Sequence, residues 1–383
     1  MVNEDAKAFL KKCIEYYSPS GQEREYSEFL AKFLEKFGFN VEIDKVGNLI
    51  AKKGTGKPVL LLSSHIDTIP GLLPVIEKEG KIYGRGAVDC KASLAAMVYS
   101  ITNYEFEGKN KGKIIFGGIV QEEDSLIGIE EFLKYDINPD YAIFGEPTDL
   151  NQICIGYKGR LCLSLKITTK AGHVACSWQF DNAIEIALEI WNIVKKTCNI
   201  LNEKHIRFSN EQKKYFQMII PTLSVISGGL LTNVVPSECN IKIDIRFPPD
   251  ITSNEILSNL NDSINLFKHS HKSNQNKEFM IQEEILSQIE GFEIKGNELI
   301  VGALRWAIYN TIKQKPVLIK KTGTTFINQI GIQYKIPSIT YGPGNPKLEH
   351  TDEEFIEVED YLKAIEIYSK FISKVFENYQ KKH

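Results

Sequence analysis

Four short apolar runs constrain the fold of this chain more than any other feature. They are Val59 to Ser64, Ile114 to Gln121, Tyr141 to Gly145 and Ser338 to Tyr341. Runs of this length and character are typical of parallel strands that are buried on both faces. Helical patterns lie between several of them, as connections between parallel strands require. The sequence therefore predicts an α/β domain built on a mostly parallel mixed sheet flanked by helices.

Histidines and carboxylates stand at the ends of these runs. The residues are His65, Asp67, Glu122, Glu123, Glu146 and, after a longer gap, His350, and a turn-rich segment after the first run adds Asp89. Ligands bind beyond the carboxyl ends of the strands in open α/β sheets. Two histidines and four carboxylates are what a pair of bridged divalent cations requires, and these residue types suit zinc or cobalt. A metallohydrolase site is therefore the leading interpretation.

Each of these residues also has an ordinary structural interpretation when it is taken alone. Asp67 lies two residues after His65 on an extended chain, so it can orient the His65 ring, but a polar strand end gives the same pattern. Asp89 can bridge two cations, or it can serve as a turn or helix-cap residue. Glu146 by itself is weak evidence for a metal site, and His350 by itself fits an ordinary surface loop.

Glu122 and Glu123 form the most informative pair. Adjacent acids at the end of a buried strand repel one another and are costly to desolvate, so they favour a nearby cation. One of them can bind a metal ion while the other acts as the general base for a water molecule. The alternative is the acidic first turn of a helix around residues 127–133, where the helix dipole favours carboxylates.

Composition narrows the class of protein. The chain has 383 residues and a formal net charge of −3, which allows two domains and argues against non-specific nucleic-acid binding. Residues 1–17 fit an amphipathic helix rather than a signal peptide, and no apolar stretch is long enough to span a bilayer. The seven cysteines form no Cys-x-x-Cys pair. We therefore expect a cytoplasmic protein with reduced cysteines.

The order of elements predicts a split catalytic domain. Residues 1–158 and 286–383 share the helix and strand pattern of the metal-binding part. Between them, residues 159–285 read as strand, helix, strand, strand, helix, strand, which is the order of a ferredoxin-like α+β unit. We expect a helix over residues 181–198 with Asp181 as its N-cap, and a last strand over residues 278–283. Residues 199–217 lack periodicity and are expected to form a loop or a mobile helix.

These motifs resemble those of the cocatalytic zinc amidohydrolases, which include acetylornithine deacetylase, succinyl-diaminopimelate desuccinylase, aminoacylases and carboxypeptidase G. The resemblance rests on His65-Ile66-Asp67, residues 84–91, Glu122-Glu123, residues 145–148 and His350-Thr351-Asp352. It extends over nearly the whole chain, and the order and spacing of the motifs are specific.

The resemblance implies a role for each residue. The implied ligands are His65, Asp89 and Glu146 for one cation, and Asp89, Glu123 and His350 for the other. Asp67 and Glu122 would be the catalytic residues, with Glu122 moving a proton from the attacking water to the leaving amine. The implied cofactors are two divalent ions, zinc or cobalt, and the implied reaction is hydrolysis of a linear amide bond. A cis peptide bond after Asp89 is also implied.

Within this family the chain is most similar to hydrolases that release lysine or ornithine from the C-terminal glutamate of an amino-group carrier protein in lysine and arginine biosynthesis. The similarity rests on residues 63–71, 86–89, 145–148, 155–160 and 320–324. The chain departs from the usual pattern at Ala92, at Thr325-Phe326 and in residues 199–217. N-acetylornithine, N-succinyl-diaminopimelate and peptides are alternative substrates for the same chemistry.

Three residues of the inserted segment have counterparts in the same family. His173 lies in a Gly-His-x-Ala turn, and the resemblance implies that it crosses a homodimer to the partner's active site and stabilises the developing oxyanion. Asn233 and Arg246 lie in segments that resemble substrate-contacting ones, and an arginine suits a bidentate grip on an α-carboxylate. The inserted segment is therefore expected to be a lid and dimerisation domain. The alternative for each of these three residues is a purely structural role, in a turn or at the edge of a strand.

Basic residues near the inserted segment can attract an acidic carrier protein, although they can equally be solvated surface charge. They are Lys158, Arg160, Lys166, Lys170, Lys320 and Lys321. The expected partners are therefore a second copy of the chain and an acidic carrier protein, with neither nucleic acid nor membrane.

Overall fold

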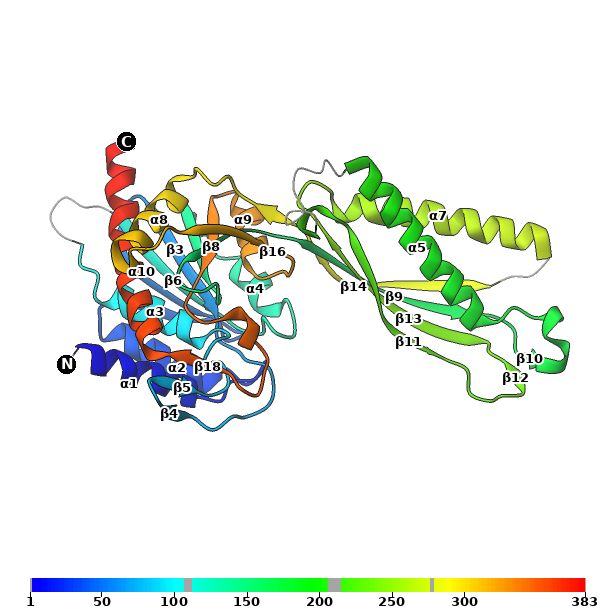
Figure 1. Ribbon diagram of the computed structural model, residues 1–383, viewed down its shortest axis with the longest axis horizontal. Coiled ribbons are helices and arrows are strands. Elements are labelled where there is room, and N and C mark those ends of the chain that lie inside the picture. The colour runs from blue at the N-terminus through cyan, green and yellow to red at the C-terminus, as the bar shows by residue number, and fades with distance from the viewer. Residues whose placement is uncertain (1, 107–111, 206–214, 276–278, 383) are drawn as a thin grey trace. The chain divides into compact units, whose positions relative to one another are not determined.

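The computed structural model describes residues 2–106, 112–205, 215–275 and 279–382. These residues form two compact units, which Figure 1 draws as ribbons. Unit 1 comprises Met1–Gly156, Ile294–Lys320 and Thr325–His383, and unit 2 comprises Tyr157–Glu293 and Lys321–Thr324. Each unit has its own hydrophobic core. None of the helices in the described ranges combines the length and the apolar character needed to cross a membrane.

A mixed sheet organises unit 1. Its strands are β1 (Asn40–Ile43), β2 (Leu49–Thr55), β3 (Val59–His65), β6 (Gly112–Ile119), β7 (Tyr141–Gly145), β8 (Gln152–Tyr157), β16 (Val317–Lys321) and β17 (Ser338–Tyr341). They run in the order β1-β2-β6-β3-β7-β17-β8, and β16 also pairs with β8. The four central strands β6, β3, β7 and β17 are mutually parallel. These are the four apolar runs, so the predicted parallel sheet is confirmed.

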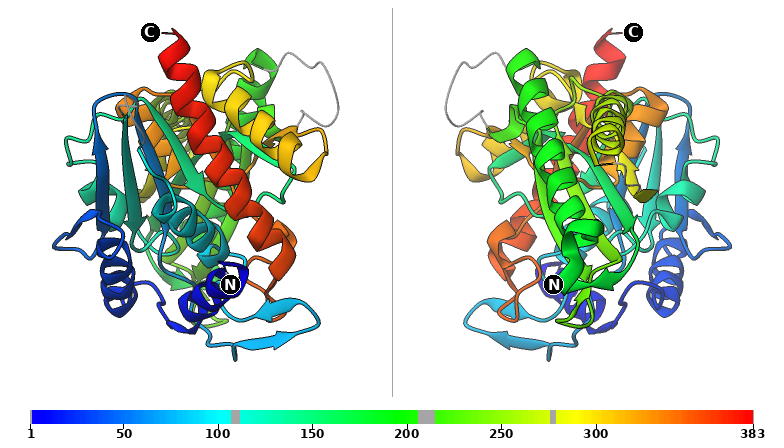
Figure 2. Two further views of the ribbon diagram at one scale, coloured as in Figure 1. Left: turned by 90° about the vertical axis from the view of Figure 1, so that its left-hand side faces the viewer. Right: turned by 90° about the vertical axis from the view of Figure 1, so that its right-hand side faces the viewer.

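Helices pack on this sheet. They are α1 (Val2–Glu15), α2 (Arg24–Glu35), α3 (Lys91–Thr102), α4 (Ile127–Phe132), α8 (Leu299–Ile312), α9 (Ile327–Tyr334) and α10 (Val358–Lys382). The helices α1, α2, α3, α8 and α10 share one core with the sheet, whereas α4 contacts β6 and α9 contacts β7 and β17. α3 is buried along nearly its whole length, and α10 contacts both α3 and α8, as Figure 2 shows. A small sheet, β18 (Phe355–Glu357), β5 (Lys81–Tyr83) and β4 (Ile76–Lys78), and a short helix η2 (Pro346–Leu348) complete the unit.

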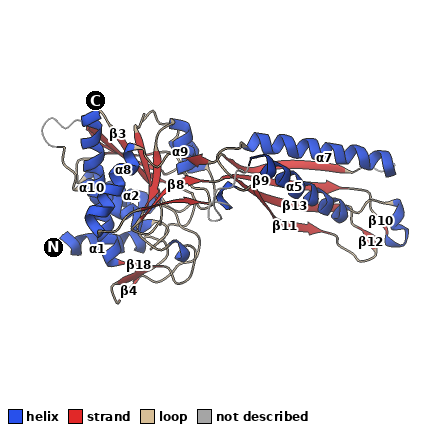
Figure 3. Cartoon of the chain, turned by 45° about the horizontal axis from the view of Figure 1, so that its top comes forward, coloured by secondary structure: helices blue, strands red, loops and turns tan. Residues whose placement is uncertain are grey.

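Unit 2 is a four-stranded antiparallel sheet with two helices, which Figure 3 shows on one face of the sheet. Its elements are β9 (Gly159–Thr168), α5 (Ala183–His205), β11 (Ile220–Gly228), β13 (Glu238–Phe247), α7 (Ser253–Gln275) and β14 (Met280–Ile289). The spatial order β11-β13-β9-β14 and the chain order together are those of the predicted ferredoxin-like unit. A short ribbon of β10 (Gly172–His173) and β12 (Val234–Val235), the helix η1 (Val174–Gln179) and β15 (Phe292–Glu293) are added.

Three details of unit 2 differ from the sequence prediction. The start of α5 is capped by Asn182, whose side chain accepts from the Ile184 amide at 3.0 Å, while Asp181 instead pairs with His271 at 3.0 Å. α5 continues through residues 199–205 because Asn202 exchanges two hydrogen bonds with the Ile219 backbone. The rest of the predicted loop, residues 206–214, lies outside the described residues. β14 extends to Ile289 because it pairs with β9 over that length.

Candidate metal centre

His65 and Asp89 form the centre of a cluster of acids and histidines in unit 1. His65 is the last residue of β3 and is almost fully buried. Its Nδ1 atom lies 3.1 Å from the Asp67 carbonyl oxygen, and its Nε2 atom lies 3.0 Å from Oδ1 of Asp89. Because Nδ1 faces a carbonyl oxygen, it carries the proton in the neutral ring, so Nε2 has a lone pair that could bind a metal ion.

Asp89 lies between the two histidines. Its Oδ1 atom faces His65, and its Oδ2 atom is 3.1 Å from Nε2 of His350. The same His350 nitrogen lies 3.1 Å from the Glu123 carboxylate. Two groups of potential ligands therefore share one carboxylate. The peptide bond from Asp89 to Cys90 is cis, as the resemblance implied.

The two glutamates after β6 occupy different positions. The chain turns sharply at Gln121, whose φ is 58°, and α4 begins only at Ile127. Glu122 and Glu123 therefore lie in a turn before the helix, so the alternative of a helical first turn is wrong. Glu123 joins Asp89 and His350 in a potential ligand group, whereas Glu122 belongs to neither ligand group found among the described residues.

Two residues can supply a third ligand beside His65: Cys90, which completes a compact group with His65 and Asp89, and Glu146, which lies outside both groups of potential ligands in the described residues. Glu146 follows β7 and has its Oε1 atom 3.9 Å from Nε2 of His65. That oxygen also accepts a hydrogen bond of 2.9 Å from the buried Thr325 hydroxyl. The Cys90 thiol donates to the His65 carbonyl oxygen at 3.2 Å, and burial raises its pKa to about 12. The thiol is engaged with the His65 backbone, whereas the Glu146 carboxylate faces the His65 ring, so Glu146 is the better partner for His65.

Asp67 connects the strand that carries His65 to the turn that carries both glutamates. Its Oδ1 atom accepts from the Glu122 amide and its Oδ2 atom from the Glu123 amide, each at 3.0 Å. The Ser20 hydroxyl donates to Oδ2 at 2.7 Å. Asp67 is fully buried, so these donors replace the water that its charge would otherwise need. The carboxylate therefore holds the ligand-bearing segments in a fixed arrangement.

The electrostatics of the cluster favour a divalent cation. Burial, followed by the charge of Glu146, raises the pKa of Glu122 well above the usual carboxyl range. Hydrogen bonds to Asp89 and to Glu123 raise the pKa of His350 to about 10. Both shifts mean that this group of carboxylates attracts positive charge. The oxygen and imidazole donors suit zinc and cobalt, so the residues fit a metal centre.

The residues predicted in the inserted segment lie in unit 2, where two of them are neighbours. His173 pairs with Val234 in the β10-β12 ribbon, and the Val174 amide donates to the Asn233 carbonyl oxygen at 3.2 Å. His173 and Asn233 are both exposed. Arg246 lies near the opposite end of β13, where its Nε atom bonds to Asp244 at 2.7 Å.

Three supporting residues were not identified from the sequence. They are Ser20, which donates to Asp67, Thr325, which donates to Glu146, and Glu354, which accepts from the Asp89 amide at 3.0 Å. Thr325 belongs to a segment that departs from the usual family pattern, whereas Ser20 lies outside every motif described above. Glu354 gave no signal beyond its position four residues after His350. Their partners are distant in sequence, so no local pattern reports them.

Comparison with protein families finds one match that covers most of the chain. The model of peptidase family M20/M25/M40 matches residues 61–374. A protein of Pyrococcus furiosus, provisionally named a LysW-lysine/LysW-ornithine hydrolase, is 32% identical over 98% of both chains. A protein of Sulfurisphaera tokodaii, named a LysW-lysine/LysW-ornithine hydrolase, is 32% identical over 96% of this chain and 95% of its own.

Solved structures share the fold. A tripeptidase from Staphylococcus aureus has a TM-score of 0.79 at 22% identity, covering 98% of this chain and 99% of its own. A metallo-carboxypeptidase of the M20 family from Sulfolobus solfataricus has a TM-score of 0.78 at 18% identity, covering 97% and 99%. At these identities the similarity concerns the fold alone.

Proposed function

The chain belongs to peptidase family M20/M25/M40, a family of hydrolases, and from this premise we propose that it hydrolyses a linear amide bond at a two-cation centre. The observation that carries the proposal is the position of Asp89, whose two carboxylate oxygens lie 3.0 and 3.1 Å from Nε2 of His65 and of His350. One carboxylate that faces two separate ligand groups is suited to two cations that act together.

The ligands follow from this arrangement. We propose His65, Asp89 and Glu146 for one cation and Asp89, Glu123 and His350 for the other, with zinc or cobalt as the metal. When bound, such ions acidify a water molecule and polarise an amide carbonyl. Asp67 orients the His65 ring through its position beside Nδ1, where Oδ1 lies 3.4 Å away.

Glu122 is the proposed general base. It lies in the same turn as Glu123, and the charges of Glu146 and Glu123 act on its carboxylate, so it lies near residues of both proposed ligand sets. Its raised pKa, caused first by burial, suits a group that must accept a proton from water and then donate it to the leaving amine. The products of this sequence are a carboxylate and a free amine.

The proposed substrate is lysine or ornithine linked to the carboxyl-terminal glutamate of an acidic carrier protein. The names of the two relatives that are 32% identical support this class of substrate. In unit 2, Asp244 holds Arg160 and Arg246 side by side, with Nε to Oδ distances of 2.7 Å to each. Two guanidinium groups against one carboxylate leave net positive charge, so Arg246 is suited to the α-carboxylate of the released amino acid.

A homodimer is proposed because His173 and Arg246 lie far apart within one unit 2. The ribbon that carries His173 lies beyond the Glu238 end of β13, where the Thr169 amide bonds to Ser237. Eight residues of extended chain separate Glu238 from Arg246, a length of about 26 Å. A two-residue substrate spans only about 7 Å. The two side chains reach one substrate only if they come from different subunits.

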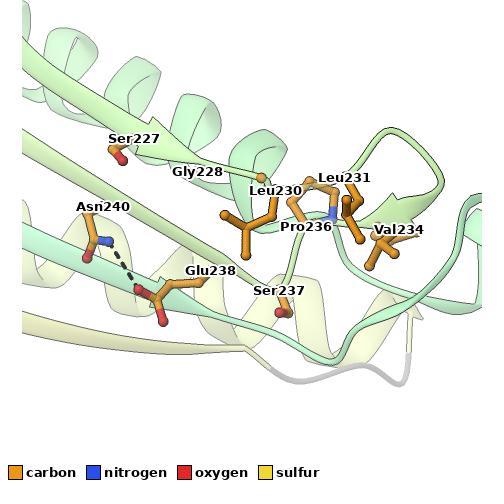
Figure 4. Close-up of a pocket in the computed structure, with 11 residues that line it drawn as sticks. Ser227, Gly228, Leu230, Leu231, Val234, Pro236, Ser237, Glu238 and Asn240 are labelled. Atoms are coloured by element: carbon orange, nitrogen blue, oxygen red, sulfur yellow. Dashed lines mark hydrogen bonds between the residues drawn. The ribbon is translucent and has the colours of Figure 1, made fainter.

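The edge strand β11 is the proposed contact between the two subunits. It carries no charged residue over Ile220–Gly228, whereas the other edge strand, β14, carries Glu283 and Glu284. Val225 and Ile226 on β11 are exposed, and an uncharged edge of this length is suited to pairing with another strand. Beyond its end, Leu230 is 100% exposed at a pocket of about 410 Å³, which Figure 4 shows with Leu231 and Val234. A second copy of the chain would cover these apolar side chains.

The decisive experiment offers the zinc-loaded or cobalt-loaded protein three substrates side by side: carrier-linked lysine, N-acetylornithine and N-succinyl-diaminopimelate. We expect the highest kcat/KM for the carrier-linked substrate. Equal or higher kcat/KM for N-acetylornithine would overturn the carrier assignment and indicate a biosynthetic deacetylase instead. No hydrolysis of any amide by metal-loaded protein would overturn the proposed chemistry.

A further inference from the structure

Glu354 is a buried acid whose carboxylate meets four donors from one turn. Its Oε2 atom accepts from the Gly86 amide at 3.0 Å and from Nη1 of Arg85 at 3.1 Å. Its Oε1 atom accepts from the Val88 amide at 2.8 Å and from the Asp89 amide at 3.0 Å. The residue is only 1% exposed, so these bonds replace its entire hydration.

The backbone around Glu354 is built to bring these donors together. Phe355 of β18 pairs with Tyr83 of β5, and the Gly84 amide donates to the Glu354 carbonyl oxygen at 3.2 Å. Gly86 has a φ of +83°, and a Cβ there would lie 2.8 Å from Thr68. The turn can therefore form only with glycine at this position, and it directs successive amides at one anion.

Arg85 links Glu354 to the loop that carries His350. Its Nη1 atom donates to the Thr351 carbonyl oxygen at 2.8 Å as well as to Glu354. Arg85 is 6% exposed, so the ion pair with Glu354 is shielded from water. His350 itself has a φ of +61°, a conformation that needs support from its surroundings. The segment that carries Asp89 is thus held to Glu354 by backbone amides. The segment that carries His350 is joined to Glu354 by four residues of chain and by the contact of Arg85 with Thr351.

We propose that Glu354 is a positioning residue that holds Asp89 and His350 close enough to bind one cation together before any cation arrives. The inference rests on the proposed metal centre. Asp89 and His350 are separated by more than two hundred residues of sequence, and Glu354 is the acid that bonds to the Asp89 amide from the His350 loop. Fixed ligands lose less conformational freedom on binding, so they hold the ion more tightly.

The test compares Glu354→Gln with Glu353→Gln, an exposed neighbour that changes charge by the same amount. A glutamine at position 354 cannot accept at both atoms. Zinc stoichiometry and Kd are measured by chelator competition. We expect Glu354→Gln to bind zinc about 10-fold to 100-fold more weakly, with Glu353→Gln unchanged. Because Glu354 does not touch the substrate, saturating zinc should return kcat to within about threefold of the parent value.

The outcomes separate the inference from the function on which it rests. If the parent protein binds no zinc, the metal centre fails and the inference with it. If the parent binds two ions and Glu354→Gln binds them equally well, only the positioning role is overturned. Should Glu354→Gln fail to fold by circular dichroism, Glu354→Asp keeps the charge but is too short to reach all three amides. Unchanged zinc affinity in that variant would also overturn the role.

Discussion

Oδ1 of Asp67 accepts a hydrogen bond of 3.0 Å from the backbone amide of Glu122. This contact joins the end of β3 to the turn after β6, and so it sets the proposed base against the strand that carries His65. A single buried carboxylate thereby controls both the orientation of a potential metal ligand and the position of the residue that moves protons.

Glu122→Gln should abolish turnover and keep the metal. The amide cannot accept a proton from water, so we expect kcat to fall on the order of a thousandfold. Metal content by elemental analysis should stay near the parent value because Glu122 belongs to neither ligand group. Asp124→Asn, an exposed acid in the same turn, is the control. Full activity of the Gln variant, or loss of bound metal, would contradict the assignment.

Thr325→Val should weaken the cation site that contains Glu146. The variant removes the hydroxyl that donates to Oε1 of Glu146 at 2.9 Å and keeps the shape of the side chain. We expect zinc affinity to fall roughly 10-fold, as for other lost hydrogen bonds to metal ligands. Thr325→Ser keeps the hydroxyl and should behave like the parent protein. Equal zinc affinity of the valine and serine variants would argue against this role.

Mixing two inactive variants should restore activity if the site is shared between subunits. Glu122→Gln and His173→Ala are each expected to be inactive, yet a mixed dimer contains one site with both groups intact. Recovery should approach one quarter of the parent activity at equal mixing, since about half the dimers are mixed. Size-exclusion chromatography with light scattering gives the oligomeric state. A monomer, or no recovery after verified subunit exchange, would refute the shared site.

Arg246 and the pair Lys320-Lys321 should affect substrates differently. Arg246→Ala is expected to lower kcat/KM for carrier-linked and small substrates alike, by roughly 10-fold to 100-fold, because charged hydrogen bonds contribute about 1.5 to 3 kcal/mol. Both lysines are half-buried. Replacing both with serine should slow only the carrier-linked substrate, and more at low salt, if their charges act mainly on the encounter rate. Equal losses for both kinds of substrate in the lysine variant would contradict carrier attraction.

Lys158 should make the free energy of unfolding increase with pH in the alkaline range. Burial, followed by the charge of Arg246, lowers the pKa of Lys158 from 10.5 to about 8. Between these values the unfolded chain holds a proton that the folded chain lacks, so stability rises as pH increases from about 8 to about 10.5. The rise is at most about 3 kcal/mol, from 1.36 kcal/mol per pKa unit.

The measurement is urea unfolding of the parent protein and of Lys158→Met across that range. The methionine variant should lack the increment due to Lys158. Lys91, whose pKa is also lowered to about 8 by burial, is present in both proteins and cancels in the difference. Parallel stability curves for the two proteins would show that Lys158 does not titrate in this range.

The sequence alone predicted the parallel sheet because its strands are short apolar runs. Val59 to Leu62 is apolar without interruption, and it opens a strand that is buried along its whole length. The sequence predicted the ferredoxin-like unit from the order of its strands and helices. The strand ends alone indicated a metal site at one edge of the sheet. The resemblance of the motifs then implied His65, Asp89, Glu123, Glu146 and His350 as the ligands. The sequence located α5 correctly but ended it too early, because the bond between Asn202 and the Ile219 backbone is not local.

Only the tertiary structure decided how these side chains are held. It assigned the two oxygens of Asp89 to two histidines that lie 285 positions apart, His65 and His350. It also identified Thr325 and Glu354, whose bonds to Glu146 and to the Asp89 amide join distant segments. The pattern that predicts a strand lies in residues that are neighbours in the sequence. The hydrogen bonds that hold a polar site in place join distant residues and form only after the chain has folded.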